Sequence, residues 1–324
     1  MKLSIIIPFL ASQNPVALNA LVDGFIFRNS NDFQIIIANY RSAGSSGASL
    51  DALAAKDERI KIQRHMYDDI GAALISAINI ADGEYILIED ILDFSDFHES
   101  GNVLTENYAD QIISLIENSG ADILLLQNHD NFEKPRDEIL VSLSAKIPYI
   151  LRDKVFKKEL ITSDAPNFID EAVWEKAVLG VLLIMRAQTF AASPEPAIRR
   201  RPNPQNFLLS DFDKYMGALI KLSGLTESAH SGNEAVMRQW MCEIYLKALY
   251  PLYFRLSSEK RRAHKNAMKD FAWLLSAPKI RDARLAAVVV FFGIFPASVI
   301  FFCFFWTKEK LEKLEKFLRF INQK

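Results

Sequence analysis

The chain has 324 residues, half of them hydrophobic, and a formal net charge of −2. Its length and hydrophobic content are sufficient for a sizeable core and for two structural units. The small negative charge argues against a general nucleic-acid-binding protein, which needs a basic face. The two cysteines, Cys242 and Cys303, are far apart in sequence, so no disulfide framework is expected and a reducing cytoplasmic compartment is favoured.

In chain order, short apolar segments alternate with segments of helical periodicity from residue 3 to residue 127. We expect strands at residues 3–7, 33–38, 60–63, 85–88 and 122–127, and helices at residues 16–27, 50–56, 70–81 and 108–119. Strands that alternate with helices form βαβ units with a parallel sheet. The sequence therefore predicts a doubly wound α/β domain.

The segment 83–94 joins an apolar run to a group of acids. Residues 85–88 are apolar, and Glu89, Asp90 and Asp93 follow them. This is typical of a buried parallel strand with acids at its carboxyl end. Ligands bind at that edge of open α/β sheets, and carboxylates there can hold a divalent cation and, through it, a diphosphate. An acidic N-cap followed by a solvated turn is the alternative.

Six segments follow one another in a distinctive order: Ser4-Ile5-Ile6-Ile7-Pro8, Phe33-Gln34-Ile35-Ile36-Ile37, Ala81-Asp82-Gly83-Glu84-Tyr85-Ile86, and residues 153–161, 168–174 and 198–203. Together they resemble the motifs of the family 2 glycosyltransferases, which have the GT-A fold. The resemblance covers about residues 1–205. It implies a Rossmann-like, mostly parallel sheet flanked by helices.

The resemblance also implies an activity and its partners. Such enzymes transfer a sugar from a nucleotide-diphosphate donor to a hydroxyl of a glycan, and the resemblance suggests inversion at the sugar. A divalent metal, Mg²⁺ or Mn²⁺, neutralises charge on the leaving diphosphate. A carboxylate acts as general base on the acceptor hydroxyl.

The resemblance assigns the donor nucleotide to Pro8, Asn39, Tyr40 and Arg41. Asn39 and Tyr40 occupy the positions of an Asp pair in the family. An amide at position 39 can still hydrogen-bond a base edge, and a tyrosine can stack on a base. Arg41 either contacts a phosphate or is a solvated loop cation.

The metal motif departs from the family pattern. Asp90 and Asp93 match its first and last acids, and Asp90 is also expected to contact the donor. The middle acid, usually the direct ligand, is replaced by Leu92, which cannot coordinate a cation. Either Asp93 or Glu89 replaces it after a local register change, or metal binding is weak or lost.

The expected general base comes later in the chain. Asp170 and Glu171, followed by Trp174, match the family segment that carries the catalytic carboxylate. We expect Glu171 to be the base, with Asp170 beside it. The alternative is the acidic first turn of an exposed helix.

The sequence of the last third of the chain predicts helices followed by a membrane-associating segment. Amphipathic helices are expected at 209–222 and 233–256, the second kinked at Pro251. Residues 285–306 carry no charge, have basic residues on both sides and could cross a bilayer. This run forms either a re-entrant hairpin on the cytoplasmic face or a single kinked span. Residues 309–321 form either a basic amphipathic helix on an anionic membrane or a solvated helix.

The expected organisation is a GT-A domain, a helical region and a membrane-associating segment with a basic helix, at residues 1–207, 208–278 and 279–324. The expected protein is a glycosyltransferase on the cytoplasmic face of a membrane. Its partners are a nucleotide-sugar donor, a lipid-linked or cell-envelope glycan acceptor and the membrane surface, with no nucleic acid. The alternative is a catalytically degenerate scaffolding subunit, which is favoured by Tyr40, Leu92 and the apolar pair Leu74 and Ile75 where the family has polar residues.

A run of three arginines, Arg199, Arg200 and Arg201, matches a late family segment whose following loop closes over the donor diphosphate. A guanidinium group can bind phosphate with two parallel hydrogen bonds, although a solvated edge strand is the alternative. Replacing all three with alanine should weaken binding of UDP or GDP about tenfold or more, because hydrogen bonds to charged groups contribute about 1.5–3 kcal/mol each. Calorimetry measures the affinity for the nucleotide, and an unchanged affinity would show that these arginines do not bind the diphosphate.

Overall fold

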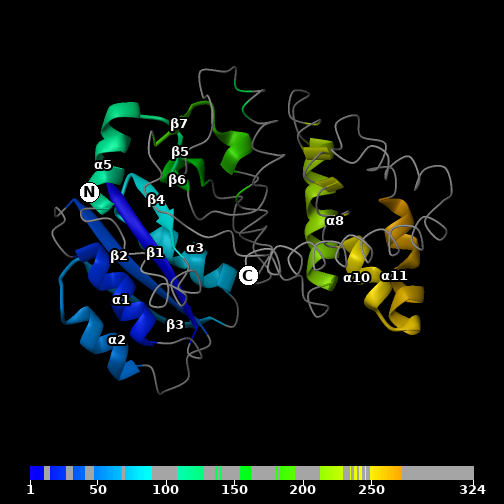
Figure 1. Ribbon diagram of the computed structural model, residues 1–324, viewed down its shortest axis with the longest axis horizontal. Helices are drawn as coiled ribbons and strands as arrows, with labels where there is room; N and C mark the ends of the chain where they lie inside the picture. The colour runs from blue at the N-terminus through cyan, green and yellow to red at the C-terminus, as the bar shows by residue number, and fades with distance from the viewer. Residues whose placement is uncertain are drawn as a thin grey trace, which may run out of the picture. The chain divides into compact units, whose positions relative to one another are not determined.

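We describe a computed structural model of the chain (Figure 1). It describes residues 1–10, 15–26, 32–40, 47–67, 70–89, 108–126, 154–161, 183–193, 212–228 and 249–271, and the single residues 136, 139, 180, 234, 237, 238, 241, 242 and 245. The chain divides into two compact units, Met1–Gln205 and Asn206–Lys324.

Within the described residues, the first unit contains a seven-stranded sheet in the order β3-β2-β1-β4-β6-β5-β7. Its strands are β1 (Leu3–Leu10), β2 (Phe33–Tyr40), β3 (Ile60–Tyr67), β4 (Tyr85–Ile88), β5 (Ile123–Leu125), β6 (Lys154–Lys157) and β7 (Phe190–Ala192). Strand β1 pairs in parallel with β2 and β4, β2 pairs in parallel with β3, and β5 pairs in parallel with β7, whereas β6 is antiparallel to both β4 and β5. The predicted mostly parallel sheet is confirmed, and the antiparallel β6 in its interior was not foreseen.

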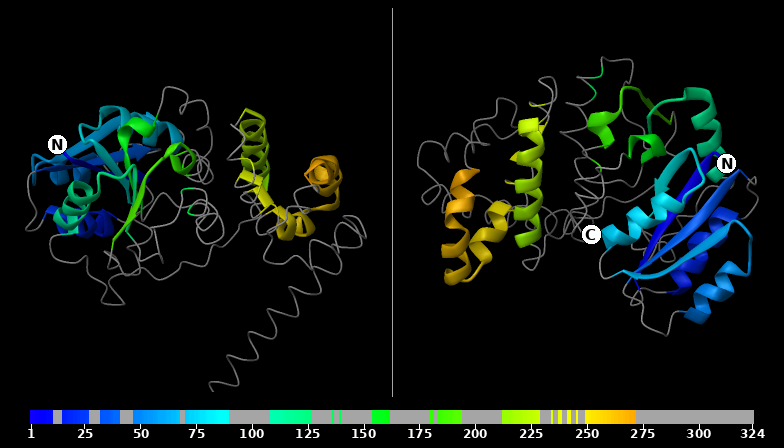
Figure 2. Two further views of the ribbon diagram at one scale, coloured as in Figure 1. Left: turned by 90° about the horizontal axis from the view of Figure 1, so that it is seen from above. Right: turned by 180° about the vertical axis from the view of Figure 1, so that it is seen from behind.

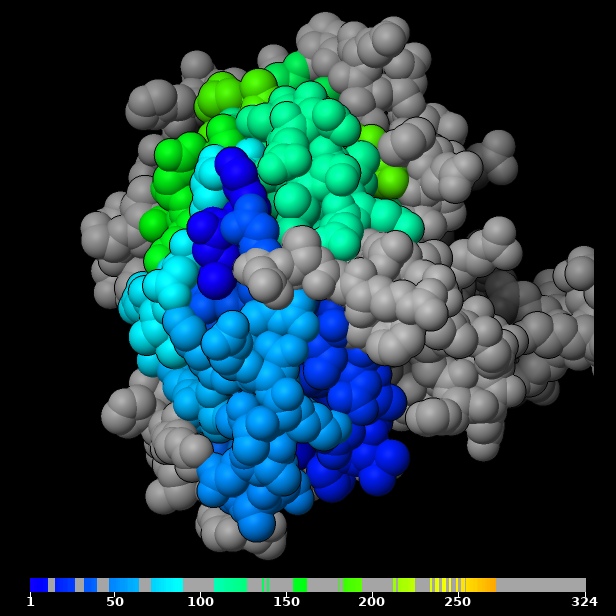
Figure 3. All heavy atoms as spheres, turned by 90° about the vertical axis from the view of Figure 1, so that its left-hand side faces the viewer, coloured from blue at the N-terminus to red at the C-terminus, as the bar shows by residue number. Residues whose placement is uncertain are grey.

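Helices cover both faces of this sheet (Figures 1 and 2). The helices are α1 (Pro15–Ile26), α2 (Gly47–Ala54), α3 (Ile70–Ile80) and α5 (Tyr108–Ser119). Side chains alternate across a strand, so Leu3, Ile5 and Ile7 form one core with α1, α2 and α5. Helix α3 packs on β1, β2 and β3 from the other face. The space-filling view from the side of the N-terminus shows α2 and α5 at the surface (Figure 3).

The second unit contains α8 (Phe212–Ser228), α10 (Tyr250–Arg255) and α11 (Ser258–Asp270). The helix predicted at 209–222 is α8, which begins at Phe212 and continues to Ser228. In the helix predicted at 233–256, the described residues that precede α10 are helical as well, and Pro251 lies in the first turn of α10. No helix among the described residues is long and apolar enough to cross a membrane. The predicted segments 285–306 and 309–321 lie outside those residues.

A close backbone contact fixes the start of β4. The Gly83 N–H donates a hydrogen bond to Ser4 Oγ at 2.8 Å, and Gln34 Nε2 donates to the same oxygen at 2.8 Å. Ser4 and Gln34 are both fully buried. A Cβ atom added at Gly83 would lie 2.5 Å from the Ser4 nitrogen, closer than Cβ atoms approach any heavy atom. Glycine is therefore the residue that fits here.

Replacing Gly83 with alanine should lower the free energy of unfolding by about 1–3 kcal/mol or more, since the added methyl group overpacks against backbone that cannot move independently. Urea denaturation measures the change. Gly47→Ala is the matched control, because nothing lies within 4 Å of its added Cβ atom, and its effect should stay within about 0.5 kcal/mol. Equal effects for the two variants would contradict the tight contact.

Candidate active site

The order of the strands places a topological switch point between β1 and β4. From β1 the chain passes to β2 and β3 on one side, and it then crosses to β4 on the other side. The β1–β2 pairing continues to Leu10 and Tyr40, but the β1–β4 pairing ends at Ile6 and Ile88. Ligands of open α/β sheets bind outside the carboxyl ends of the strands at such a point.

Three residues predicted to contact the nucleotide lie at this carboxyl edge. Pro8 is among the last three residues of β1. Asn39 and Tyr40 are the last two residues of β2. Pro8 is buried and pairs in register with Ala38. The structure thus brings the ends of β1 and β2 side by side.

Asn39 carries an unsatisfied polar atom at this edge. The residue is half-buried, and its Oδ1 is shielded from solvent and has no hydrogen-bond partner among the described residues. A buried acceptor without a donor destabilises the folded state by about 1–3 kcal/mol. Such an atom at the ligand-binding edge of a sheet is suited to accept a hydrogen bond from a ligand N–H group.

Glu89 follows β4 but points into the core. Its side chain is fully buried, on the same face as Leu87. The Tyr108 hydroxyl donates a long hydrogen bond of 3.5 Å to Glu89 Oε1, and the Tyr108 ring lies 5.6 Å from that of Phe25. Glu89 is therefore enclosed between the sheet and α5. This position does not favour the alternative in which Glu89 replaces Leu92 as a metal ligand. The sequence did not identify Tyr108 as a hydrogen-bond donor to Glu89. The available signal was a tyrosine on the apolar face of α5.

The other predicted site residues lie outside the described residues: Arg41, Asp90, Asp93, Asp170, Glu171, Arg199 and Arg201, with the side chain of Tyr40. Among the residues that are described, no group of three or more His, Cys, Asp or Glu side chains could hold a metal ion. The described carboxylate at this edge, Glu89, does not fit a metal site because it is buried beside Tyr108. The expectation of Mg²⁺ or Mn²⁺ therefore rests on Asp90 and Asp93.

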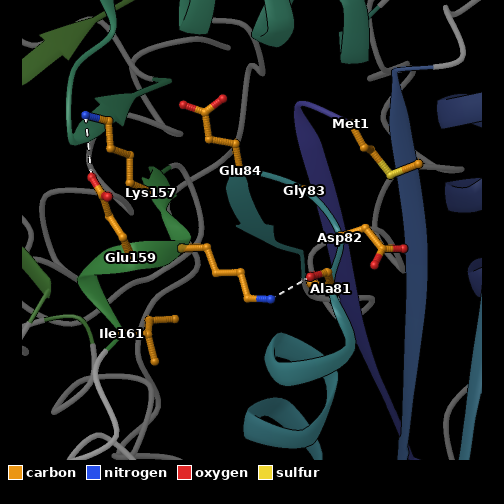
Figure 4. Close-up of a pocket in the computed structure, with 9 residues that line it drawn as sticks. Met1, Ala81, Asp82, Gly83, Glu84, Lys157, Glu159 and Ile161 are labelled. Atoms are coloured by element: carbon orange, nitrogen blue, oxygen red, sulfur yellow. Dashed lines mark hydrogen bonds and ion pairs between the residues drawn. The ribbon is translucent and has the colours of Figure 1, made fainter.

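A hollow of about 580 Å³ lies at the opposite edge of the sheet (Figure 4). It is lined by residues before β4, including Gly83 and Glu84, and by Lys157 and Lys158 at the end of β6. Its cations already have partners: Lys158 Nζ donates to the Ala81 carbonyl at 2.6 Å, and Lys157 pairs with an Asp122 oxygen at 3.0 Å. The hydrogen bond to Asp122 raises the pKa of Lys157. Because both lysines already have partners within the protein, we do not assign the active site to this hollow.

Comparison with solved structures defines the class of fold. No protein-family model matches the chain, and no curated protein matches it. Residues 1–349 of S. aureus TarS in complex with UDP-GlcNAc have 12% sequence identity and a TM-score of 0.59, over 86% of this chain and 82% of that chain. The mannosyltransferase PcManGT from Pyrobaculum calidifontis, in complex with GDP-Man and Mn²⁺, has 11% identity and a TM-score of 0.51, over 93% and 82%. The chain spans half the length of a longer TarS structure, at 13% identity and a TM-score of 0.57. The chain therefore has a Rossmann-like glycosyltransferase fold.

The unsatisfied oxygen of Asn39 leads to a prediction on stability. Asn39→Leu should leave the free energy of unfolding unchanged or raise it, because it removes a buried acceptor that has no partner. Gln34→Leu is the matched variant on the same strand: it too removes an acceptor without a described partner, Oε1, but it also removes the bond from Nε2 to Ser4 Oγ. It should therefore lower the free energy of unfolding by about 1 kcal/mol relative to Asn39→Leu. Both are measured by urea denaturation. Destabilisation by Asn39→Leu as large as that by Gln34→Leu would show that the Asn39 amide has a structural role.

Proposed function

We propose that this chain is a family 2 glycosyltransferase that transfers a sugar from a nucleotide-diphosphate donor to a hydroxyl of a lipid-linked or cell-envelope glycan, with inversion. The observation that carries the proposal is the unsatisfied Asn39 oxygen at the switch point between β1 and β4. Structures of the same fold hold UDP-GlcNAc and GDP-Man, which supports a nucleotide-sugar donor.

In this proposal the carboxyl edge of the sheet binds the nucleotide. Asn39 Oδ1 accepts a hydrogen bond from an N–H of the base, Tyr40 stacks on the ring and Pro8 lines the site. Arg41, Arg199 and Arg201 contact the diphosphate. Hydrogen bonds between guanidinium groups and phosphate are short and strong, so these contacts hold the leaving group.

The reaction proposed is a direct displacement at the anomeric carbon. Glu171 takes the proton of the acceptor hydroxyl, and Asp170 lies beside it in sequence. The acceptor oxygen forms the new bond to the anomeric carbon while the bond to the diphosphate breaks, and the nucleoside diphosphate leaves with the electron pair. General-base assistance of this kind contributes about 10²–10⁴-fold to rate.

A divalent cation is part of the proposal, with Asp90 and Asp93 as its ligands. When bound, the cation would supply positive charge against the leaving diphosphate. The Mn²⁺ bound with GDP-Man in PcManGT supports this, and the burial of Glu89 favours Asp93 over Glu89 as the ligand that replaces Leu92. We also propose the cytoplasmic face of a membrane as the location, where the run 285–306 would bring the site near a lipid-borne acceptor.

A second candidate function is a binding or scaffolding subunit without turnover. One observation favours it: Leu74, which replaces a polar residue of the family, is buried in α3 against the sheet. A packing residue at that position contributes no polar contact to a donor. The two functions differ in whether a donor is bound and hydrolysed.

Calorimetry with UDP-, GDP- and CMP-sugars, with and without Mn²⁺, tests the proposal. We expect one donor to bind and to be hydrolysed slowly without acceptor. Asn39→Leu should weaken its binding about tenfold, the effect of one lost hydrogen bond. Glu171→Gln should retain binding and reduce turnover about a hundredfold or more.

Asn79→Leu, at an exposed position near the end of α3, is the matched control and should bind the donor as the wild type does. Glu89→Gln should leave the Mn²⁺ dependence of binding unchanged, whereas Asp93→Asn should alter it. No binding across the whole panel would support the scaffold instead.

A further inference from the structure

Helix α11 has a firmly packed inner face. The side chain of Ser257 caps its first turn by accepting a hydrogen bond from the Lys260 N–H. Met268 is fully buried, and the Tyr245 hydroxyl donates to its carbonyl at 2.8 Å. The His264 ring contacts Phe212 of α8, with 4.9 Å between ring centres. These contacts fix the rotation of α11 about its axis and so determine which residues face solvent.

The outer face of α11 carries a stripe of cations, which we call the basic stripe: Arg262, Lys265 and Lys269. Their spacing of three and four residues places them on one side of the helix, and all three are exposed. Among the residues that the structure describes, none of the three forms an ion pair or a side-chain hydrogen bond. Residues 249–271 contain six lysines and arginines but only two acids, in a chain whose net charge is −2.

Like charges at this spacing destabilise a helix by a few tenths of a kcal/mol per pair. The fold does not require them, because packing of α11 uses its other face. An uncompensated basic stripe therefore fits an external anionic partner.

The chemistry of the stripe favours a bilayer over other anions. Separated cations on a convex helix form no fork or concavity for a single phosphate, and no aromatic side chain lies among the exposed residues of α11 on which a base could stack. The sequence after α11 reaches the uncharged run 285–306 across residues 271–284. A basic patch together with an apolar insertion gives stable attachment to an anionic membrane, whereas either signal alone is weak.

We propose that the basic stripe of α11 binds the anionic phospholipid headgroups of a bilayer. This contact is independent of the proposed sugar transfer and needs no nucleotide. Electrostatic attraction to such a surface contributes about fivefold in affinity for each cation.

Flotation of the full-length chain with vesicles tests the proposal, without any nucleotide sugar present. Wild type should bind vesicles of phosphatidylcholine mixed with phosphatidylglycerol, and less so as salt is raised, because salt screens exposed charges. Arg262→Ala, Lys265→Ala and Lys269→Ala combined should weaken that binding about a hundredfold. Binding to vesicles of phosphatidylcholine alone should be the same for the variant and the wild type.

The charge-preserving combination Arg262→Lys, Lys265→Arg and Lys269→Arg is the matched control and should retain binding. Removing acid from the same helix, with Glu259→Gln and Asp270→Asn, should strengthen it. The proposal is overturned if the alanine variant binds anionic vesicles as the wild type does, if the wild type does not bind them, or if a nucleic-acid duplex displaces the vesicles. Circular dichroism confirms that the variants fold.

Discussion

The contact between Gly83 and Ser4 fixes the positions of the central strands of the first unit. Through the Ser4 hydroxyl it connects β1, β2 and the start of β4, all within the buried layer of the sheet. Since β4 has only four residues, its register against β1 follows from where it begins. That register in turn places Glu89 beside Ile6, whose carbonyl accepts a hydrogen bond from the Glu89 N–H at 2.9 Å.

Polar groups at the carboxyl edge illustrate how a functional site differs from a core. Glu89 is buried and has a hydroxyl near it, so its carboxylate belongs to the packing of α5. Asn39 is only half-buried, and its Oδ1 has no hydrogen-bond partner in the described part of the chain. Natural proteins retain such destabilising groups where a ligand uses them. On this contrast we propose Asn39 as a contact with the ligand and Glu89 as a support for the packing of α5.

The second unit uses amphipathic helices in a different way. In α11 the buried Met268 and the contact of His264 Nε2 with Asp213 Oδ1 at 3.0 Å hold one face against its neighbours. An exposed side of the same helix keeps the basic stripe, which packing does not need. A fold can thus orient a charged surface by means of contacts elsewhere on the same helix.

The sequence by itself determined strands β1 to β5 and the helices between them. Apolar runs predicted these strands, because burial on both faces leaves a continuous apolar strand, but β1 continues through Pro8 to Leu10, beyond the end predicted for it. The same reasoning could not place β6 between β4 and β5, nor decide that Glu89 faces Tyr108 and not solvent. Strand order and side-chain direction depend on which segments meet across long sequence separations, and local periodicity carries no information about that. Only the tertiary structure decided that the ends of β1, β2 and β4 share one edge with an unsatisfied Asn39, since partners far apart in sequence define both the edge and the missing hydrogen bond.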